Sequence, residues 1–318
     1  MLHGASFWNR PRGPLWSVLI DRLRHRGHLS AELLVIASCL AGRTDIVHFL
    51  DGEQARLFLL HLVRLAHLSR VKTVVTFHSP PEILRERVNG DLLRRVDQVV
   101  LVSPTQLPFF LPHVPEDRID VILHGVDIEF FSPSILRKEA RDFRCVTVGH
   151  WLREWNVLRR VASALPEVIF DVVPAGRQTD LGGLANVHLH RDIDDAALAE
   201  VYRSADVLLL PLIDATANNA LLEGMASGLP VVVTDLPAVR AYLPDCGGLF
   251  VPHNSVDGFI AALQSLQRDT GLRHALGRNA RARAEQLAWP RLVPEYEAHY
   301  RRMLARGPLG HSREEGTE

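Results

Sequence analysis

The segment Ala205–Asp235, ADVLLLPLIDATANNALLEGMASGLPVVVTD, constrains the fold of this chain more than any other. It reads as a buried strand, a polar loop, a helix that carries one acid, a Gly-Leu-Pro turn and a second buried strand, which together make one βαβ unit. In open α/β sheets, ligands bind at the carboxyl ends of the strands. The unpaired N–H groups and partial positive charge of a helix N-terminus suit a phosphate there. The segment therefore predicts a site for a phosphorylated ligand.

Length and composition limit the class of protein. A chain of 318 residues is comfortable for two domains of about 150 residues each, and 47% hydrophobic with 23% charged content is ordinary for a soluble protein. The formal net charge of −1 provides no global basic field to recruit nucleic acid. The three cysteines are far apart without metal-ligand spacing, and no apolar run reaches about 18 residues. We therefore expect a cytoplasmic protein, either soluble or peripheral to the inner membrane face.

Short apolar runs alternate with amphipathic stretches along nearly the whole chain, which indicates parallel α/β architecture. Strands are predicted at Ile46–Leu50, Thr73–Phe77, Gln98–Val102, Ile119–Leu123, Arg144–Val148, Val168–Val173, Asn186–Leu189, Val207–Leu210, Val231–Val233 and Gly248–Val251. Helices are predicted at Leu15–Arg26, Glu53–Ser69, Pro81–Arg95, Val157–Leu165, Ala196–Ser204, Asn218–Ser227, Val256–Gln267, Leu272–Gln286 and Pro290–Ala305. The segment Phe130–Phe143, with Ser-Pro punctuation and no clear period, predicts an interdomain linker, whereas Met1–Pro14 lacks the strand that usually opens a Rossmann-like domain.

Four segments, in matching order and spacing, resemble one enzyme family. LLEGMASGLPVVVTD (Leu221–Asp235) is similar to a donor-site signature, and HGVDIEFF (His124–Phe131) is similar to a hinge segment, with His124 in place of asparagine. VTFHSPPE (Val75–Glu82) resembles a strand-end histidine segment, and LAWPRLVPEYEAHYRRML (Leu287–Leu304) resembles a closing helix. Together they resemble the retaining GT-B glycosyltransferases of group 1 and family 4, the large group that includes the phosphatidylinositol mannosyltransferases and sucrose synthases.

The resemblance implies an α/β fold of two Rossmann-like parallel-sheet domains facing across a cleft, with a C-terminal helix that crosses back to the first domain. The implied parts are an acceptor-side domain (1–132), a nucleotide-sugar-binding domain (133–288) and the crossover helix (289–305); the tail (306–318) is expected to be disordered because it is polar and contains glycine. The implied activity is metal-independent transfer of a hexose, with retention, from a nucleotide-diphosphate sugar. The acceptor would be a saccharide, a lipid-linked sugar or a small molecule. No cofactor beyond the donor substrate is expected.

The donor site is expected around the helix that carries Glu223. The face around this residue is otherwise apolar and small, and a buried acid needs a partner or a function. The matching glutamate of the family holds the ribose of the nucleotide sugar. A second family glutamate, which contacts the donor sugar, is replaced by Ala215, so the neighbouring Asp214 is the candidate carboxylate there. Asn218 and Asn219 are predicted to bind phosphate or sugar hydroxyls, and the alternative for Asn218 is a helix N-cap.

Two other segments supply candidates. In VTVGHWLREW (Val146–Trp155), Gly149 is expected to let the backbone approach the phosphates closely. The family places two basic residues after this glycine; here a histidine and a tryptophan stand at those positions, so Arg153 is predicted as the substitute cation, helped by His150 when protonated. The alternative for Arg153 is an exposed arginine at a helix start. The strand-end His78 matches the histidine that contacts the donor sugar in the family, and the alternative is a capping or core-edge histidine.

Two other functions are compatible with the same fold. Ala215 and the missing basic pair favour a non-catalytic nucleotide-sugar-binding subunit. A nucleotide-sugar epimerase would need two acids flanking the sugar, and the sequence supplies one. The triplet Asp192-Ile193-Asp194 resembles the family's segment before a helix, so no metal site is predicted. The expected partners are a nucleotide sugar and its acceptor, with no nucleic acid.

Overall fold

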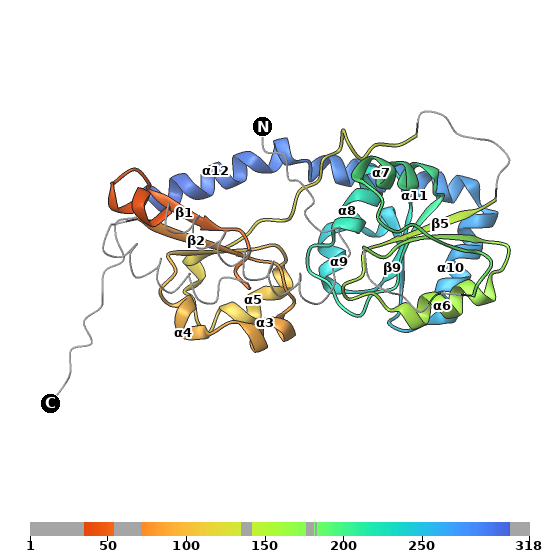
Figure 1. Cartoon of the computed structure of the whole chain (residues 1–318), viewed down its shortest axis with the longest axis horizontal. Helices are drawn as coiled ribbons and strands as arrows, with labels where there is room; N and C mark the ends of the chain where they lie inside the picture. The colour runs from red at the N-terminus through yellow and green to blue at the C-terminus, as the bar shows by residue number, and fades with distance from the viewer. Residues whose placement is uncertain (1–34, 54–70, 135–141, 176–180, 182, 306–318) are drawn as a thin grey trace, which may run out of the picture. The chain divides into compact units, whose positions relative to one another are not determined.

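The computed structural model describes residues 35–53, 71–134, 142–175, 181 and 183–305 (Figure 1). The described residues divide into two compact units. The larger unit comprises Leu123–Leu292, and the smaller unit comprises residues up to Ile122 together with those from Val293 onwards. None of the helices in these ranges combines the length and the apolar character that crossing a membrane requires.

The larger unit is built on an all-parallel sheet with the strand order β10-β9-β8-β5-β6-β7. Its strands are β5 (Arg144–Val148), β6 (Ile169–Val173), β7 (Val187–Leu189), β8 (Val207–Leu210), β9 (Val231–Thr234) and β10 (Gly248–Val251). The central strands β8 and β9 are buried along their whole length, which is why both read as unbroken apolar runs. Strand order reverses between β5 and β8, and ligands bind at such switch points in folds of this kind.

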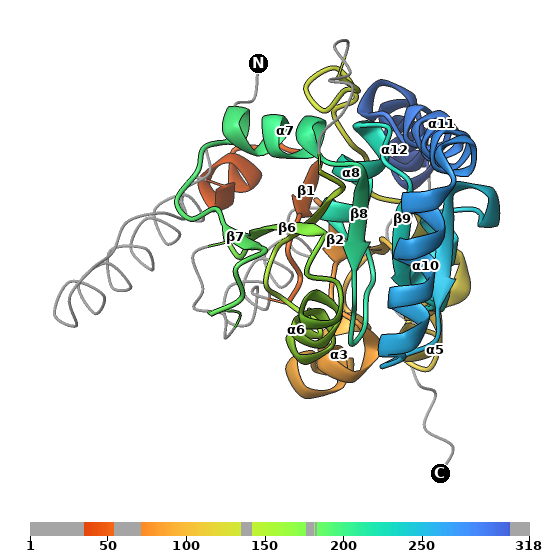
Figure 2. The same ribbon diagram turned by 90° about the vertical axis from the view of Figure 1, so that its right-hand side faces the viewer.

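Helices cover both faces of this sheet. One face shares a hydrophobic core with α7 (Asp195–Ser204), α8 (Asn219–Ala226), α9 (Pro237–Tyr242) and α11 (Thr270–Gln286). The opposite face packs against α6 (Trp155–Ala164) and α10 (Val256–Arg268), which lie next to each other (Figure 2). The helix α8, which contains the candidates Asn219 and Glu223, therefore lies on the same side of the sheet as α7.

The smaller unit has a four-stranded parallel sheet in which spatial order follows chain order. Its strands are β1 (Ile46–Phe49), β2 (Lys72–Phe77), β3 (Gln98–Leu101) and β4 (Ile119–Val121). One face packs against α3 (Pro81–Arg87), α4 (Gly90–Leu93) and α5 (Leu107–Phe110). The other face packs against the later part of α12 (Trp289–Ala305) (Figure 1). The contacting side chains of the helix are Tyr296, Tyr300 and Met303. The helix α12 thus begins in the larger unit and ends in the smaller one.

The predicted strands are all present, with ends that differ by at most two residues. One predicted helix, Pro81–Arg95, is wrong, because α3 and α4 replace it. Val88 is extended after α3, and the Asn89 side chain accepts the N–H of Asp91 and starts a new turn. The expected Leu15–Arg26 helix, most of the Glu53–Ser69 helix, the opening Met1–Pro14, the Arg306–Glu318 tail and part of the Phe130–Phe143 linker lie outside the described residues. The expected domain boundaries remain predictions.

Candidate functional site

Gly149 forms a crowded turn at the carboxyl end of β5. Its N–H donates to the carbonyl of Val173 over 2.9 Å, and its φ of +86° lies in the region that favours glycine. A Cβ on Gly149 would lie 2.8 Å from Nη2 of Arg153. The turn therefore needs glycine for two reasons, its backbone conformation and the closeness of the arginine.

The guanidinium of Arg153 is buried and lies against this turn. Nε and Nη2 donate to the carbonyl of Val148 over 2.9 and 2.7 Å, and Nη1 donates to the carbonyl of Trp151 over 3.0 Å. Nη2 also donates to Oδ1 of Asn218 over 3.3 Å. Burial lowers the pKa of Arg153 to about 10, so the group stays charged at neutral pH. The alternative of an exposed arginine at a helix start is wrong, because Arg153 is buried and precedes α6.

Asn218 and Asn219 have different surroundings at the start of α8. Asn218 is the N-cap, and its buried Oδ1 accepts the N–H of Leu221 over 3.2 Å as well as the bond from Arg153. Asn219 is the first helical residue and is exposed. The capping alternative for Asn218 is thus confirmed, and Asn219 is the asparagine whose side chain is open to a ligand.

Glu223 lies one turn into α8, on the face that meets α7. The hydroxyl of Tyr202, on α7, donates to Oε2 of Glu223 over 2.8 Å. Tyr202 is completely buried, whereas Glu223 remains partly exposed. The carboxylate is thus held by a buried phenol, on a residue that keeps part of its surface exposed.

The pKa of Glu223 is set mainly by the burial of its carboxyl group. Burial raises the pKa of Glu223 to about 7; the Tyr202 hydrogen bond and the charge of Arg153 lower it, and Asp195 raises it. Burial and the neighbouring Glu223 raise the pKa of Tyr202 well above its usual value, so the phenol remains a donor. The site combines a carboxyl group that titrates near neutral pH with a permanently charged arginine. Perturbed groups of this kind are concentrated at functional sites.

Asp214 lies in the loop between β8 and α8. It is partly exposed, and its Oδ1 accepts the N–H of Ala215 over 2.7 Å. Ala215 is buried in the core that the sheet shares with α7 and α8. A short apolar side chain therefore fills the position where the family has its second glutamate.

His78 belongs to the smaller unit and directly follows β2. Its Nε2 lies 2.8 Å from the carbonyl oxygen of Leu50, which can only accept, so Nε2 carries a proton. The side chain is partly exposed. His78 is thus a strand-end residue held by a neighbouring loop, and its contact with the donor sugar remains a prediction.

Comparisons with known proteins agree with this architecture. Residues 5–130 match the family model described as "Glycosyltransferase Family 4", and residues 128–269 match the one described as "Glycosyl transferases group 1". The D-inositol 3-phosphate glycosyltransferase of Paenarthrobacter aurescens (strain TC1) is 28% identical over 84% of this chain and 74% of its own length. The phosphatidyl-myo-inositol mannosyltransferase of Mycolicibacterium smegmatis is 28% identical over 78% of this chain and 68% of its own.

Solved structures share the fold. The sucrose-phosphate synthase of Thermosynechococcus elongatus superimposes with a TM-score of 0.72 at 19% identity, over 96% of this chain and 82% of that one. The Anabaena HepE protein in complex with UDP-glucose gives 0.71 at 18% identity, over 85% and 82%. The chain is a GT-B glycosyltransferase.

One contact of the candidate site could not be predicted from the sequence of this glycosyltransferase. Tyr202 is 21 residues from Glu223, and its place in the apolar stretch of α7 predicts only a core residue. The acidic triplet precedes a helix, as expected, and Asp194 caps α7 by accepting the N–H of Ala197. Within the described ranges, no group of three or more His, Cys, Asp or Glu side chains could hold a metal ion.

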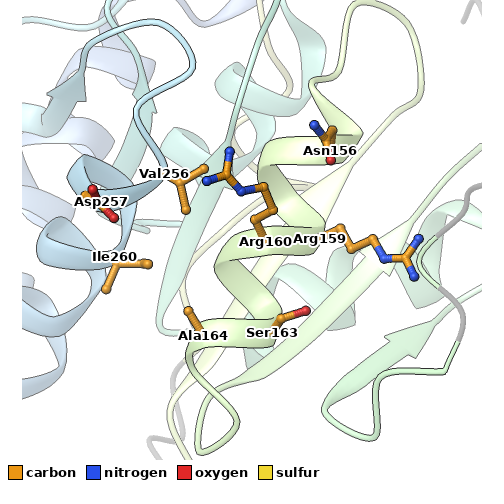
Figure 3. A pocket seen from close by; sticks show the side chains of 8 residues that line it. All are labelled: Asn156, Arg159, Arg160, Ser163, Ala164, Val256, Asp257 and Ile260. Atoms are coloured by element: carbon orange, nitrogen blue, oxygen red, sulfur yellow. The ribbon is translucent and has the colours of Figure 1, made fainter.

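A groove of about 600 Å³ lies between α6 and α10 of the glycosyltransferase, on the opposite face of the sheet from α8 (Figure 3). Arg160 extends towards Val256 across this groove, whereas Arg159 points away from α10 (Figure 3). The lining is Asn156, Arg159, Arg160, Ser163, Ala164, Val256, Asp257 and Ile260, which includes none of the candidate residues. The groove is therefore separate from the site.

The crowding at Gly149 can be measured. Gly183 has the same φ of +86°, but a Cβ added there would meet no atom within 4 Å among its described surroundings, so it is a matched control. Gly183→Ala should cost about 1–2 kcal/mol for backbone conformation alone. Gly149→Ala should cost about 2 kcal/mol more in urea denaturation, because the methyl group must displace the buried Arg153. If both variants lost the same free energy of unfolding, the side chain of Arg153 would be able to move away from the added methyl group at no energetic cost.

Proposed function

We propose that this glycosyltransferase binds a nucleotide-diphosphate sugar at the Gly149 turn and the start of α8, and transfers the sugar with retention of configuration. The observation that carries the proposal is that Glu223, a partly exposed residue one turn inside a helix at the sheet's switch point, has its carboxylate fixed by Tyr202. A carboxylate so placed can accept both hydroxyls of a ribose, while the helix N-terminus faces the diphosphate.

The remaining roles follow from the positions of the side chains. Arg153 has five N–H donors, four of which are engaged by described residues, and its charge stabilises the leaving diphosphate from beneath the Gly149 turn. Asn219, exposed at the first position of α8, contacts phosphate or sugar oxygens. Asp214 supplies the carboxylate next to Ala215, and His78 contacts the transferred sugar. With these groups present we expect no requirement for a metal ion.

The comparisons support the chemical class of the substrates. Solved HepE structures hold UDP and UDP-glucose, and the relatives' names refer to inositol phosphate and phosphatidylinositol acceptors. We therefore propose a uridine or related nucleotide sugar as the donor and a hydroxyl group of a sugar or polyol as the acceptor. The protein would act in the cytoplasm, in solution or at the inner membrane face.

Ligand-induced stabilisation tests this proposal. A panel of nucleotide-diphosphate sugars should raise the melting temperature of the parent protein, because a ligand at about 100 times its dissociation constant adds roughly 2.7 kcal/mol. Glu223→Gln should abolish the shift; glutamine is preferable to alanine because it still accepts the buried Tyr202 hydroxyl. Glu200→Gln, at a side chain that is 72% exposed on α7, is the matched control and should respond like the parent.

The outcomes separate the parts of the proposal. A Glu223→Gln protein that responds like the parent would show that the ribose assignment is wrong. A parent protein that responds to no nucleotide sugar would contradict the donor site as a whole. Transfer assays with the active donor then give the anomeric configuration of the product by NMR, and an unchanged rate in EDTA is expected.

A further inference from the structure

The buried carboxylate of Glu53 binds the backbone at His78 and at the residue that follows it. The N–H groups of His78 and Ser79 both donate to Oε1 of Glu53, over 2.6 Å in the case of His78. Glu53 is buried and lies 25 residues before His78, in the turn that follows β1. Because hydrogen bonds to a charged acceptor are about twice as strong as neutral ones, this residue holds the two amides firmly.

The same short segment is held from its carbonyl side. Nε2 of Gln106 donates to the carbonyls of Phe77 and Ser79 over 3.1 and 3.0 Å. Oε1 of Gln106 is itself fixed by the N–H of Ser103 over 3.0 Å. The backbone around His78 therefore has its N–H groups bound to one buried side chain and its carbonyls bound to another.

The ring of His78 is oriented by the turn that also contains Glu53. Its Nε2–H donates to the carbonyl of Leu50, and this bond sets the direction in which Nδ1, the other ring nitrogen, points. Gly52, next to Glu53, donates its N–H to the carbonyl of Thr76 over 2.9 Å, and so ties this turn to β2. One turn thus sets both the backbone and the ring of the histidine.

Among the described residues, the carboxylate of Glu53 accepts hydrogen bonds only from the backbone of the His78 loop. Oε2 is buried and has no hydrogen-bond partner among the described residues. Burying a carboxylate is costly unless it is compensated, and a neutral acceptor could satisfy two amides without that cost. The charge of Glu53 is therefore directed at the two N–H groups of His78 and Ser79.

We propose that Glu53 is a positioning residue for sugar transfer, which fixes the backbone and the Nδ1 direction of His78. This inference rests on the role proposed above for His78. A displacement of about 1 Å at a reacting group can cost a hundredfold in rate. Loosening the loop should therefore reduce turnover without changing the nucleotide site, whose residues lie in the larger unit.

Glu53→Gln tests the proposal, since it keeps an acceptor oxygen and removes the charge. We expect kcat to fall about tenfold to a hundredfold, with the KM for the donor and the nucleotide-induced melting shift unchanged. Glu53→Asp keeps the charge but shortens the side chain, and should give an intermediate kcat; it also serves if the glutamine variant folds poorly. Glu82→Gln, at a side chain 68% exposed on α3, is the control and should match the parent.

A double-mutant cycle with His78→Ala distinguishes positioning from general support of the fold. If Glu53 acts through His78, Glu53→Gln should lower kcat less than twofold in the His78→Ala background. Equal losses in both backgrounds, or a kcat that does not change in the single variant, would overturn the proposal. If His78→Ala itself leaves kcat unchanged, the role proposed for His78 fails, and if the nucleotide-induced shift is absent from the parent, the donor site fails.

Discussion

Replacing Arg153 with methionine should lower the free energy of unfolding of the larger unit by about 3–5 kcal/mol, the usual cost of removing one partner from a buried charged network. The methionine is similar in length but cannot donate the bonds that reach the carbonyl of Val148 and Oδ1 of Asn218. Those buried acceptors would lose their donor, and the N-cap of α8 would lose the group that orients it. The charge that offsets Glu223 would also be gone.

Arg160→Met is the matched control for this experiment. Arg160 lies on the neighbouring helix α6, is exposed, and lines the groove shown in Figure 3 rather than the site. Its replacement should change stability by less than about 0.5 kcal/mol in urea denaturation. If Arg153→Met were as mild as its control, the arginine would have no structural role, and its only function would be to bind the diphosphate.

The strands could be predicted from sequence because a parallel sheet covered on both faces produces unbroken apolar runs. VLLL in β8 and VVVT in β9 are examples, and both are fully buried. The candidate site could be placed at the carboxyl ends of these strands for the same reason, since that position follows from where the apolar runs end. Glu223 stood out as one acid on an apolar helix, and the structure places it beside a buried tyrosine.

The partners of these residues could not be predicted, because they come from other elements. Tyr202 reaches Glu223 across 21 residues, Arg153 reaches Asn218 across 65, and Glu53 reaches His78 across 25. No local pattern encodes such distances. The broken helix after β2 was missed for a different reason: a single Asn-Gly step competes with the helical pattern, and an Asn side chain can start a new turn.

The unexpected burial of Arg153 strengthens the interaction of its charge with the carboxyl group of Glu223. An exposed cation would be screened by solvent, whereas this one is fixed beneath the Gly149 turn and offsets part of the burial cost of Glu223. The offset is incomplete, since the pKa of Glu223 is still raised to about 7. A carboxyl group that is easier to protonate in the folded protein than in the unfolded one must make stability depend on pH.

The free energy of unfolding should fall as pH rises from about 4.5 to 7 because of Glu223. In this window the folded protein retains a proton that the unfolded chain has lost, so unfolding releases a proton and is favoured by higher pH. A shift from 4.5 to about 7 corresponds to about 3 kcal/mol at 1.36 kcal/mol per unit. The Glu223→Gln variant cannot ionise at this position. Its free energy of unfolding should therefore rise relative to that of the parent by up to about 3 kcal/mol as the pH increases from 4.5 to 8.

Urea denaturation at several pH values measures the difference in free energy of unfolding between parent and variant. The contributions of the other titrating groups are common to both proteins and cancel in this difference. Glu200→Gln should show a constant difference, because its 72% exposed side chain changes surroundings little on folding. If the difference in free energy of unfolding between Glu223→Gln and the parent were equally independent of pH, the pKa of Glu223 would be the same in the folded and the unfolded protein. The same proton should also compete with a ribose that needs the ionised carboxylate, so nucleotide affinity of the parent should weaken up to tenfold per unit below pH 7.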